Sequence, residues 1–484
     1  MGNLFCVSEN DFNEDYNYSL QMKQPNILLF FPDQMRGDWT ELNPKLPILT
    51  PNLKKLADSG VFFSQAYCPS PLCSPSRSCL AVGKDYDNVD IINNGQNHPF
   101  DDPTFYEILR NQAGYHTMTC GKLDLRHPEH SYGNDGKHIV NGINYLEKWG
   151  FSDGVEIGGK KNGVRMWKQH RRDIGPYIMY LKEKDLVEMY VEDQSHRKFK
   201  DAHPSILENE DYVDNWIGRS GLELLKAAPR DKPWFIQVNF NGPHNPLDAT
   251  KNMLKRWESI EDIPMPVNHT RFPREDNLQI RRNYGAEIEN IDAWIPKFLD
   301  LVKERGELDN TIIIFASDHG EMLGDQDRVA KSVPFQGAIH VPLFISGPGI
   351  KKQPAITKPV NLIDLFSTIL DFAGIKPPEG VDSVSLKPVL EGKEGVQTRY
   401  IRSGLNHFRV VIENNFKLVI GYKPSNSKWS KYKRILVKKI LKPYDRKEIY
   451  KNNVQLFNLD TDPGEIHNIA KEHPEIVKRL LEIL

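Results

Sequence analysis

The sequence predicts an α/β fold with a large, mostly parallel or mixed sheet flanked by helices on both faces, and a small C-terminal α+β domain. Apolar runs without polar alternation, at residues 27–31 and 311–316, are typical of strands that are covered on both faces. Such runs alternate with amphipathic helical stretches, of which residues 284–302 form the longest. This alternation favours an open parallel sheet between two helical layers.

Local signals support the individual elements. Thr50 as N-cap, Pro51 at the first helical position and Gly60 as terminator predict a short helix. Residues 104–112 repeat this pattern and lead into a strand at 114–119. Further strands are predicted at 234–240 and 341–346.

The pattern of predicted elements changes after Gly380, from alternating strands and helices to short strands. Short segments with hairpin spacing occur at residues 409–413, 416–422 and 455–459, and a terminal helix is predicted at 474–484. We therefore expect an N-terminal extension at 1–24, a main α/β domain at 25–390 and a C-terminal α+β subdomain at 391–484.

Composition excludes several classes of protein. The 484 residues contain 63 Lys and Arg against 65 Asp and Glu, and this balance predicts no nucleic-acid partner. The apolar runs are far shorter than the ~20 residues of a membrane helix, so no membrane span is expected. No signal peptide is visible, which predicts a cytoplasmic protein as given, or a periplasmic or secreted one if a leader has been removed. The five cysteines form no disulfide framework. A basic tract at 428–446 is either a patch for an anionic substrate or a solvated surface.

Polar residues follow three of the predicted strands, where open α/β sheets bind their ligands. These are Asp33-Gln34, Asp318-His319 and the segment 241–245. Two carboxylates, an amide oxygen and an imidazole could converge on one cation, with Ca²⁺ or Mg²⁺ favoured over zinc. Each pair on its own is weak evidence, because an Asp at a strand end is more often a helix N-cap or part of a solvated turn.

The segment Cys73-Ser-Pro75-Ser-Arg77 resembles the type I sulfatase family of the alkaline phosphatase superfamily, whose motif is Cys-x-Pro-Ser-Arg. The resemblance implies that a formylglycine-generating maturation enzyme oxidises Cys73 to formylglycine. It also implies one divalent cation, Ca²⁺ with Mg²⁺ or Mn²⁺ as alternatives. Its implied ligands are Asp33, Gln34, the modified Cys73, Asp318 and His319.

Further motifs resemble the same family. Gly121-Lys122 matches its Gly-Lys pair, and Pro243-His244-Asn-Pro246 is similar to its Pro-His-x-Pro turn. The resemblance implies that Lys122 and Lys331 bind sulfate, that Arg77 holds formylglycine and that His244 protonates the leaving group. In this mechanism a hydroxyl of the hydrated aldehyde attacks sulfur, and collapse to the aldehyde later expels sulfate.

The chain departs from the family pattern at two places. Gln34 stands where many sulfatases carry a second aspartate, a variant that also resembles phosphonate monoester hydrolases. The usual histidine after Gly-Lys is missing, so Asp124, His127 or His130 is expected to contact formylglycine or substrate. This Gly-Lys-Leu-Asp run resembles sulfatases that act on uronic-acid 2-sulfates.

Three functions follow as hypotheses. The first is a carbohydrate sulfatase acting on glycosaminoglycan or algal polysaccharide fragments. The segment 153–200 is rich in basic and aromatic residues, so it is either a binding face for an anionic sugar or a solvated loop. The second is a phosphonate monoester or phosphodiester hydrolase of the same superfamily. The third is an inactive binding protein, which the competent residue types at all the implied catalytic positions disfavour.

Overall fold

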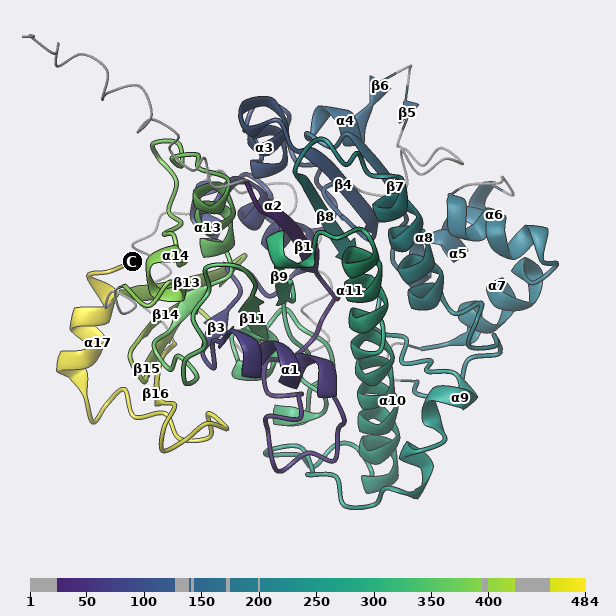
Figure 1. Ribbon diagram of the computed structural model, residues 1–484. Helices are drawn as coiled ribbons and strands as arrows, with labels where there is room; N and C mark the ends of the chain where they lie inside the picture. Colours follow the sequence, from purple (N-terminus) through teal and green to yellow (C-terminus); the bar gives the residue numbers. More distant parts are fainter. Residues whose placement is uncertain are drawn as a thin grey trace, which may run out of the picture.

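A seven-stranded mixed sheet forms the centre of the computed structural model (Figure 1). The structure describes residues 24–126, 139–140, 143–170, 175–198, 201–393, 399–422 and 453–484. In spatial order, the strands are β2 (Val61–Phe62), β11 (Leu343–Ser346), β9 (Thr311–Ala316), β1 (Asn26–Phe30), β8 (Trp234–Asn239), β4 (His116–Gly121) and β7 (Asp153–Glu156). The five strands from β9 to β7 run parallel, while β11 and β2 are antiparallel to their neighbours.

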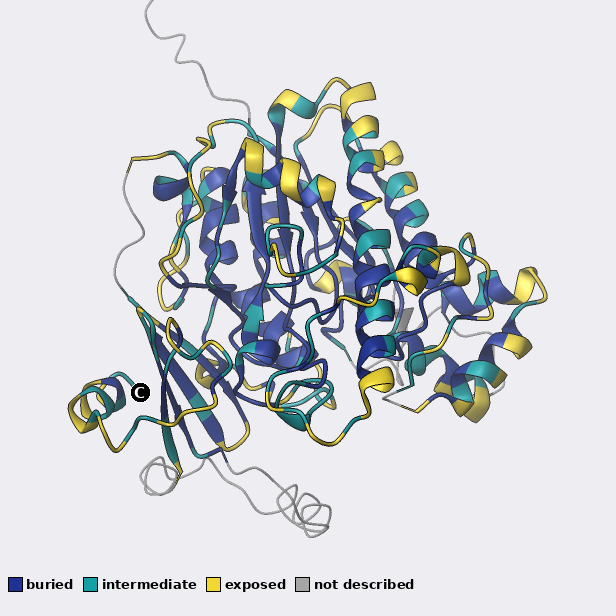
Figure 2. Ribbon diagram, turned by 90° about the horizontal axis from the view of Figure 1, so that it is seen from below, coloured by how far each residue is buried: buried dark blue, intermediate teal, exposed yellow. Residues whose placement is uncertain are grey.

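Helices cover both faces of this sheet, as the unbroken apolar runs predict (Figure 1). In β1, Ile27 and Leu29 belong to one apolar core and Leu28 and Phe30 to the other. The first core includes α2 (Cys73–Val82), α3 (Phe105–Ala113) and α13 (Asp364–Phe372). The second includes α1 (Pro51–Ser59), α5 (Lys160–His170), α6 (Pro176–Glu183), α7 (Val187–His196), α8 (Val213–Ala227), α10 (Arg274–Asp292) and α11 (Ile295–Glu304). Figure 2 shows the strands buried and the outer helix surfaces exposed.

Shorter elements connect these layers. The strands β3 (Ala66–Tyr67), β10 (His340–Val341) and β12 (Val360–Asn361) form a small sheet, and β5 (Ile139–Val140) pairs with β6 (Ile143–Asn144). The short helices are α4 (Tyr145–Lys148), α9 (Lys251–Leu254), α12 (Gln336–Ile339) and α14 (Lys387–Leu390).

The C-terminal part is a four-stranded antiparallel sheet with one helix. Its strands are β13 (Tyr400–Leu405), β14 (Phe408–Glu413), β15 (Phe416–Ile420) and β16 (Val454–Asn458), and its helix is α17 (Pro474–Leu481). Val410 and Val419 on one face of the sheet join the first core, and Val411 and Leu418 on the other face pack near Leu480 of α17. The predicted fold class is thus confirmed.

Two predicted elements differ in detail. The single long helix expected at 284–302 is instead two helices, α10 and α11, because the chain turns at Ala293 and Trp294 and Pro296 lies in the first turn of α11. The strand expected at 341–346 is interrupted at Pro342, which separates β10 from β11. Thr104 caps α3 by accepting a hydrogen bond from Glu107 N, whereas the Thr50 hydroxyl accepts one from Glu41 N and does not cap α1.

No helix within the described ranges has the length and apolar character needed to cross a membrane. The four described cysteines, Cys68, Cys73, Cys79 and Cys120, are free and buried.

Candidate active site

The polar residues after the central strands lie together because those strands run parallel and in register. Ile27 of β1 pairs with Phe235 of β8 and with Ile312 of β9, so the three strands end at the same edge. This arrangement brings Asp33 and Asp318 to one buried centre. The structure thus brings the predicted strand-end residues together at one edge of the sheet.

Cys73 is the first residue of α2 and points into this centre. Its Sγ lies 3.2 Å from Nε2 of His319, 3.2 Å from Nζ of Lys331 and 3.8 Å from Oδ1 of Asp33. Burial and the Asp33 charge raise the pKa of the thiol, but Lys122, Lys331 and His319 outweigh them and lower it to about 6. Cys73 therefore occupies an electropositive position, unlike Cys120, whose pKa burial raises to about 12.

Four of the five predicted cation ligands form a compact group. One ligand atom each from Asp33, Cys73, Asp318 and His319 lies within 4.8 Å of the others, and all four residues are buried. Nδ1 of His319 donates to the carbonyl of Gly320 at 3.0 Å, and Nε2 lies 3.7 Å from Asp33 and 3.6 Å from Asp318. The two carboxylates of this group fit a hard divalent cation, and a formylglycine in place of the Cys73 thiol would add a further oxygen.

Gln34, the fifth predicted ligand, adopts a left-handed backbone conformation with φ of 75°. Its backbone N–H donates to Oδ1 of Asp318 at 2.9 Å, and its side-chain Oε1 accepts from Nζ of Lys331 at 2.5 Å. The amide nitrogen donates to Glu321 and, at 3.3 Å, to Asn245. The neutral oxygen of Gln34 therefore faces the same centre and is bonded there to a lysine.

The positively charged side chains predicted for the site lie around the carboxylates of Asp33 and Asp318. Arg77 donates from Nε to Asp318 at 2.9 Å and from Nη1 to Asn239 at 3.1 Å, while Nη2 lies 3.9 Å from Asp33 without a hydrogen bond among the described residues. Lys122 forms an ion pair with Asp33. Burial lowers the pKa of the Lys122 ammonium, but Asp33, Cys73 and Asp124 together outweigh this effect and raise it well above its usual value. The site thus holds a fixed positive charge where an anion can bind.

His244 stands on the turn after β8. Its Nδ1 donates to the carbonyl of Asn245 at 2.5 Å, so Nε2 is the atom left for a catalytic proton. The turn is held by Asp214, which accepts from the backbone of Asn241 at 2.6 Å and of Gly242. Burial, followed by the charge of Lys331, keeps the pKa of His244 well below its usual value.

Of the three residues predicted to contact substrate, Asp124 lies in the described part of the chain. It is buried, its Oδ2 lies 3.7 Å from Nζ of Lys122, and it accepts from Oγ of Ser74 at 3.1 Å. Burial raises its pKa to about 6. His127 and His130 lie outside the described residues, as does the basic tract at 428–446.

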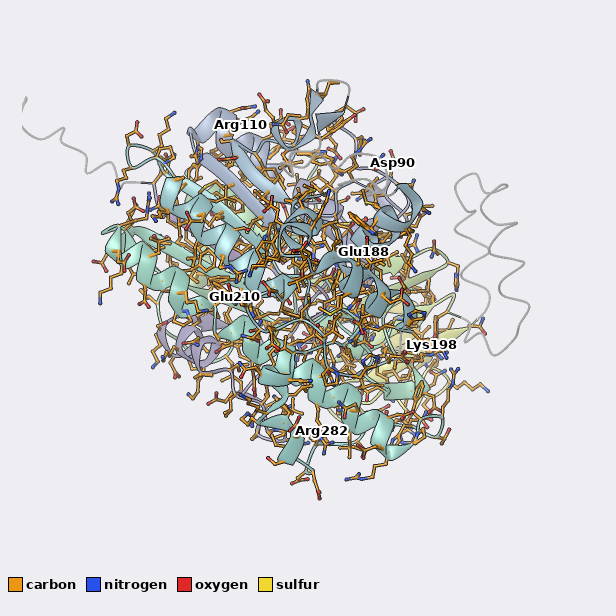
Figure 3. The ribbon with its side chains drawn as sticks, turned by 90° about the vertical axis from the view of Figure 1, so that its right-hand side faces the viewer. Asp90, Arg110, Glu188, Lys198, Glu210 and Arg282 are labelled. Carbon is orange, nitrogen blue, oxygen red and sulfur yellow. The ribbon has the colours of Figure 1, made fainter. Side chains whose placement is uncertain are left out.

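The segment 153–200, expected as a basic and aromatic surface or a solvated loop, folds largely into β7, α5, α6 and α7. Its Tyr177 and Tyr190 are buried and their rings meet edge to face, so these aromatic side chains serve the core. Glu188 and Lys198, labelled in Figure 3, are exposed. The loop interpretation is therefore wrong for the described parts of the segment.

Sequence reasoning missed several buried residues that support the site. Glu321 accepts from Gln34 and from the backbone of Leu323, and Asn239 accepts from Arg77. Lys160 donates to Asp248 at 2.7 Å and to the carbonyl of Pro246 at 3.0 Å, just behind the His244 turn. Glu321 was visible as a further acidic residue after Asp318-His319-Gly320, whereas no local pattern marks Lys160.

Comparison with known proteins agrees with the motifs. The family profile "Sulfatase" matches residues 25–375, and the profile "N-sulphoglucosamine sulphohydrolase, C-terminal" matches residues 324–484. An arylsulfatase of Clostridium perfringens is 27% identical over 95% of this chain and 94% of its own length. A choline-sulfatase of Rhizobium meliloti is 27% identical over 93% of this chain and 83% of its own.

Solved structures share the fold. A phosphonate monoester hydrolase from Silicibacter pomeroyi superimposes with a TM-score of 0.72 at 23% identity, covering 95% of this chain and 94% of its own. A structure in complex with its substrate D-glucosamine-2-N,6-O-disulfate gives a TM-score of 0.70 at 19% identity, covering 96% and 97%. Because the sulfatase profile spans most of the sequence, the chain belongs to the sulfatase family, which makes it a sulfuric ester hydrolase.

Proposed function

We propose that this enzyme hydrolyses sulfate esters of a sulfated carbohydrate, using a formylglycine formed from Cys73 and one bound divalent cation. The observation that carries the proposal is the position of Cys73 Sγ, 3.2 Å from both His319 Nε2 and Lys331 Nζ at the buried strand-end centre. A free thiol in a merely structural role is normally inert and apolar in its surroundings. Here it lies among charged groups suited to binding an anion.

The donor set of Asp33, Gln34, Asp318, His319 and residue 73 fits Ca²⁺, with Mg²⁺ or Mn²⁺ as alternatives. Such a cation, when bound, supplies Lewis acidity and lowers the pKa of a hydroxyl at residue 73. Arg77 holds Asp318, and the Gly320 carbonyl holds the His319 ring, so both ligands are oriented by the protein itself.

The remaining residues position and neutralise the substrate. Lys122 and Lys331 place two ammonium groups beside residue 73, where charge spreads over the sulfuryl oxygens during transfer. One hydroxyl of the hydrated formylglycine attacks sulfur, and the S–O bond to the sugar alcohol breaks. The second hydroxyl then loses its proton, the aldehyde re-forms and sulfate leaves.

His244 is the proposed acid for the leaving alcohol. In the free enzyme burial and the Lys331 charge hold its pKa low. A bound sulfate ester screens that positive charge and therefore makes protonation of Nε2 easier when substrate is present. The Asn245 carbonyl keeps the ring oriented with Nε2 available.

A carbohydrate substrate is supported by the structural relative that was solved with D-glucosamine-2-N,6-O-disulfate. Asp124, beside Lys122 and Ser74, is the proposed contact to the sugar or to formylglycine, together with His127 or His130. A formylglycine-generating enzyme is the implied partner during maturation.

The test is mass spectrometry of the tryptic peptide 56–77 together with aryl sulfate hydrolysis, on protein produced with a formylglycine-generating enzyme. This peptide contains both Cys68 and Cys73, so Cys68 is an internal control for modification. We expect conversion of thiol to aldehyde at Cys73 alone, and loss of turnover in Cys73→Ala. An unmodified Cys73 with full activity, or activity that survives this substitution, would overturn the formylglycine mechanism.

Gln34 favours one alternative, a phosphonate monoester or phosphodiester hydrolase of the same superfamily. A neutral amide replaces a second carboxylate, and it donates to Glu321 while accepting from Lys331. Turnover of an aryl sulfate and of an aryl phosphonate monoester by the same preparation distinguishes the two. A kcat/KM larger for the phosphonate would select the alternative.

A further inference from the structure

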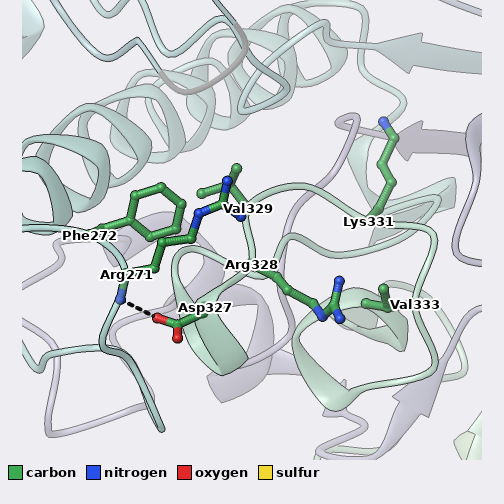
Figure 4. A pocket seen from close by; sticks show the side chains of 7 residues that line it. All are labelled: Arg271, Phe272, Asp327, Arg328, Val329, Lys331 and Val333. Atoms are coloured by element: carbon green, nitrogen blue, oxygen red, sulfur yellow. Dashed lines mark hydrogen bonds between the residues drawn. The ribbon is translucent and has the colours of Figure 1, made fainter. Parts of the chain in front are cut away.

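A cavity of about 230 Å³ opens beside the proposed sulfate-binding lysine (Figure 4). Its lining comes from two segments that are distant in sequence, Arg271-Phe272 before α10 and residues 327–333 after β9. Figure 4 shows Phe272 and the Arg271 guanidinium on one side, near Val329, and Arg328 and Lys331 on the other. Of the residues at the Cys73 centre, Lys331 is the one that also lines this cavity.

The two arginines carry uncompensated positive charge. Among the described residues, neither the Arg271 nor the Arg328 guanidinium has a carboxylate within ion-pair distance, and neither donates a side-chain hydrogen bond. Each lies against an aromatic ring, Arg271 over Phe272 at 5.4 Å and Arg328 over Tyr422 at 5.9 Å. Unpaired guanidinium groups beside a cavity are suited to a planar or tetrahedral anion.

Asp327, the acidic residue of the lining, does not neutralise them. Its Oδ1 accepts from the backbone N–H of Thr270 at 2.5 Å and of Arg271 at 2.7 Å, and its Oδ2 accepts from the Thr270 hydroxyl at 2.7 Å. The carboxylate is thus used to fix the segment that carries Arg271. Its backbone contacts hold the two sides of the cavity at a set separation.

Lys331 connects this cavity to the reacting centre. It lines the cavity, yet its Nζ lies 3.2 Å from Sγ of Cys73. A saccharide with its sulfate ester at Cys73 would have to pass Lys331 to reach Phe272 and the two arginines. The Phe272 ring offers an apolar face of the kind that packs against a pyranose ring.

We propose that Arg271, Arg328 and Phe272 form a specificity subsite for a second anionic group, a carboxylate or another sulfate, on the saccharide that carries the scissile ester. This inference rests on the proposed function, since it assigns part of the substrate of the same site. It makes the enzyme selective for polyanionic saccharides over neutral sulfate esters. Selectivity resides in the guanidinium pair, and the chemistry resides in the buried centre.

The experiment compares wild type with Arg271→Gln/Arg328→Gln, and with Arg274→Gln as a matched control. Arg274 is an exposed arginine at the start of α10 that does not line the cavity. The probes are 4-nitrophenyl sulfate as substrate, and three disaccharides as inhibitors of its hydrolysis. These are a monosulfated glycosaminoglycan disaccharide with a free uronate, its methyl ester, and its disulfated counterpart.

We expect the double variant to weaken inhibition by the charged disaccharides about 10- to 100-fold relative to its KM for the aryl sulfate, because the charged hydrogen bonds from the guanidinium groups are lost. Arg274→Gln should leave all constants unchanged. If the double variant no longer prefers the free uronate to its methyl ester, the carboxylate is the ligand of the subsite. If the double variant loses affinity only for the disulfated disaccharide, the second sulfate is the ligand. Equal inhibition of the wild type and the double variant, or no inhibition of the wild type, would overturn the subsite. Absence of aryl sulfate turnover would instead count against the proposed function, and calorimetric binding of the disaccharides would then test the subsite directly.

Discussion

Nζ of Lys331 lies 3.2 Å from Sγ of Cys73, although 258 residues separate them in sequence. The loop that carries Lys331 has several non-glycine residues in the left-handed region: Leu323, Gln326, Asp327, Ala330 and Ser332. Such conformations are costly and persist where surrounding contacts impose them. Here the contacts come from Glu321, which accepts from the Ala330 N–H, and from the Pro71 carbonyl, which accepts from Ser332 N at 3.0 Å.

Replacing Lys331 tests whether this placement serves catalysis. We expect Lys331→Ala to lower kcat/KM for an aryl sulfate by about 100- to 1,000-fold, since one preorganised charge at the transferring group is lost. Lys255→Ala, at an exposed lysine of the same charge, should not change it. Equal kcat/KM values for the two variants in steady-state kinetics would contradict the catalytic role assigned to Lys331.

Removal of the cation should inactivate the enzyme. After exhaustive dialysis against EDTA we expect turnover to fall by roughly 100-fold or more. The melting temperature should fall as well, because Asp33 and Asp318 lose a counter-charge that binds the folded state. Restoration by Ca²⁺, Mg²⁺ or Mn²⁺, each added to metal-free protein, identifies the ion. Full activity in protein whose metal content is nil by elemental analysis would refute a metal-dependent mechanism.

A buried lysine behind the His244 turn is expected to control stability. Lys160 donates to Asp248, to the Tyr212 hydroxyl at 2.8 Å and to Glu287 at 3.1 Å. Lys160→Met leaves Asp248 and Glu287 buried without their cation, which should cost about 3–5 kcal/mol in the free energy of unfolding.

The matched control for this change is Lys161→Met. Lys161 is half-buried and donates to the backbone carbonyls of Gln194 and Arg197, with no carboxylate partner among the described residues. Urea unfolding of both variants measures the difference. Equal destabilisation by the two substitutions would show that the Lys160 charge is not what matters.

Asp85 predicts a pH dependence of stability. Burial, followed by the Asp382 charge, raises its pKa to about 7, although Arg402 lies 3.5 Å away and opposes the shift. The folded state therefore keeps a proton that the unfolded chain has already released above its ordinary pKa near 4. This contribution to stability is complete below about pH 4, falls by up to about 1.4 kcal/mol per pH unit as the pH rises, and is lost above about pH 7.

Asp85→Asn should remove this slope, so that the variant gains stability relative to wild type between pH 4 and pH 7. Urea unfolding at several pH values measures the gain. Asp90→Asn, at an exposed carboxylate of the same segment, provides the comparison. Parallel curves for wild type and Asp85→Asn would rule out Asp85 as the source of the slope.

Local patterns predicted the central strands, most clearly β1 and β9 because each is a continuous apolar run, and they predicted the helices α1, α3 and α17. The helices α2, α5, α6, α7, α8 and α13 were not predicted. The break between α10 and α11 was missed because apolar spacing continues through Trp294 and Ile295, and Pro296 is tolerated in a first helical turn. The strand-end residues Asp33 and Asp318 could be predicted from topology alone. The motifs that resemble sulfatases then suggested Lys122, His244 and Lys331, which the structure brings to the same region.

Other features had no local sequence signal. The Lys160 cluster joins residues from four separate segments, and spacing along the chain says nothing about such a meeting. The basic and aromatic composition of 153–200 suggested a surface, yet Tyr177 and Tyr190 are packed inside. Composition does not distinguish aromatic residues that bind ligands from those that build a helical layer.

The loop that carries Lys331 is also bound to the C-terminal part of the chain. Nε2 of Gln326 donates to the Gly464 carbonyl at 2.8 Å, and Glu465 accepts from Gln336 N at 2.6 Å and pairs with buried Lys417. The second family profile begins at residue 324, inside this same loop. The C-terminal domain is consequently no detachable module. In a chimera that takes the chain after residue 390 from a relative, the contacts of Gln326 and Gln336 with residues 464 and 465 would no longer match. A working exchange would therefore have to transfer the loop from residue 324 onward as well.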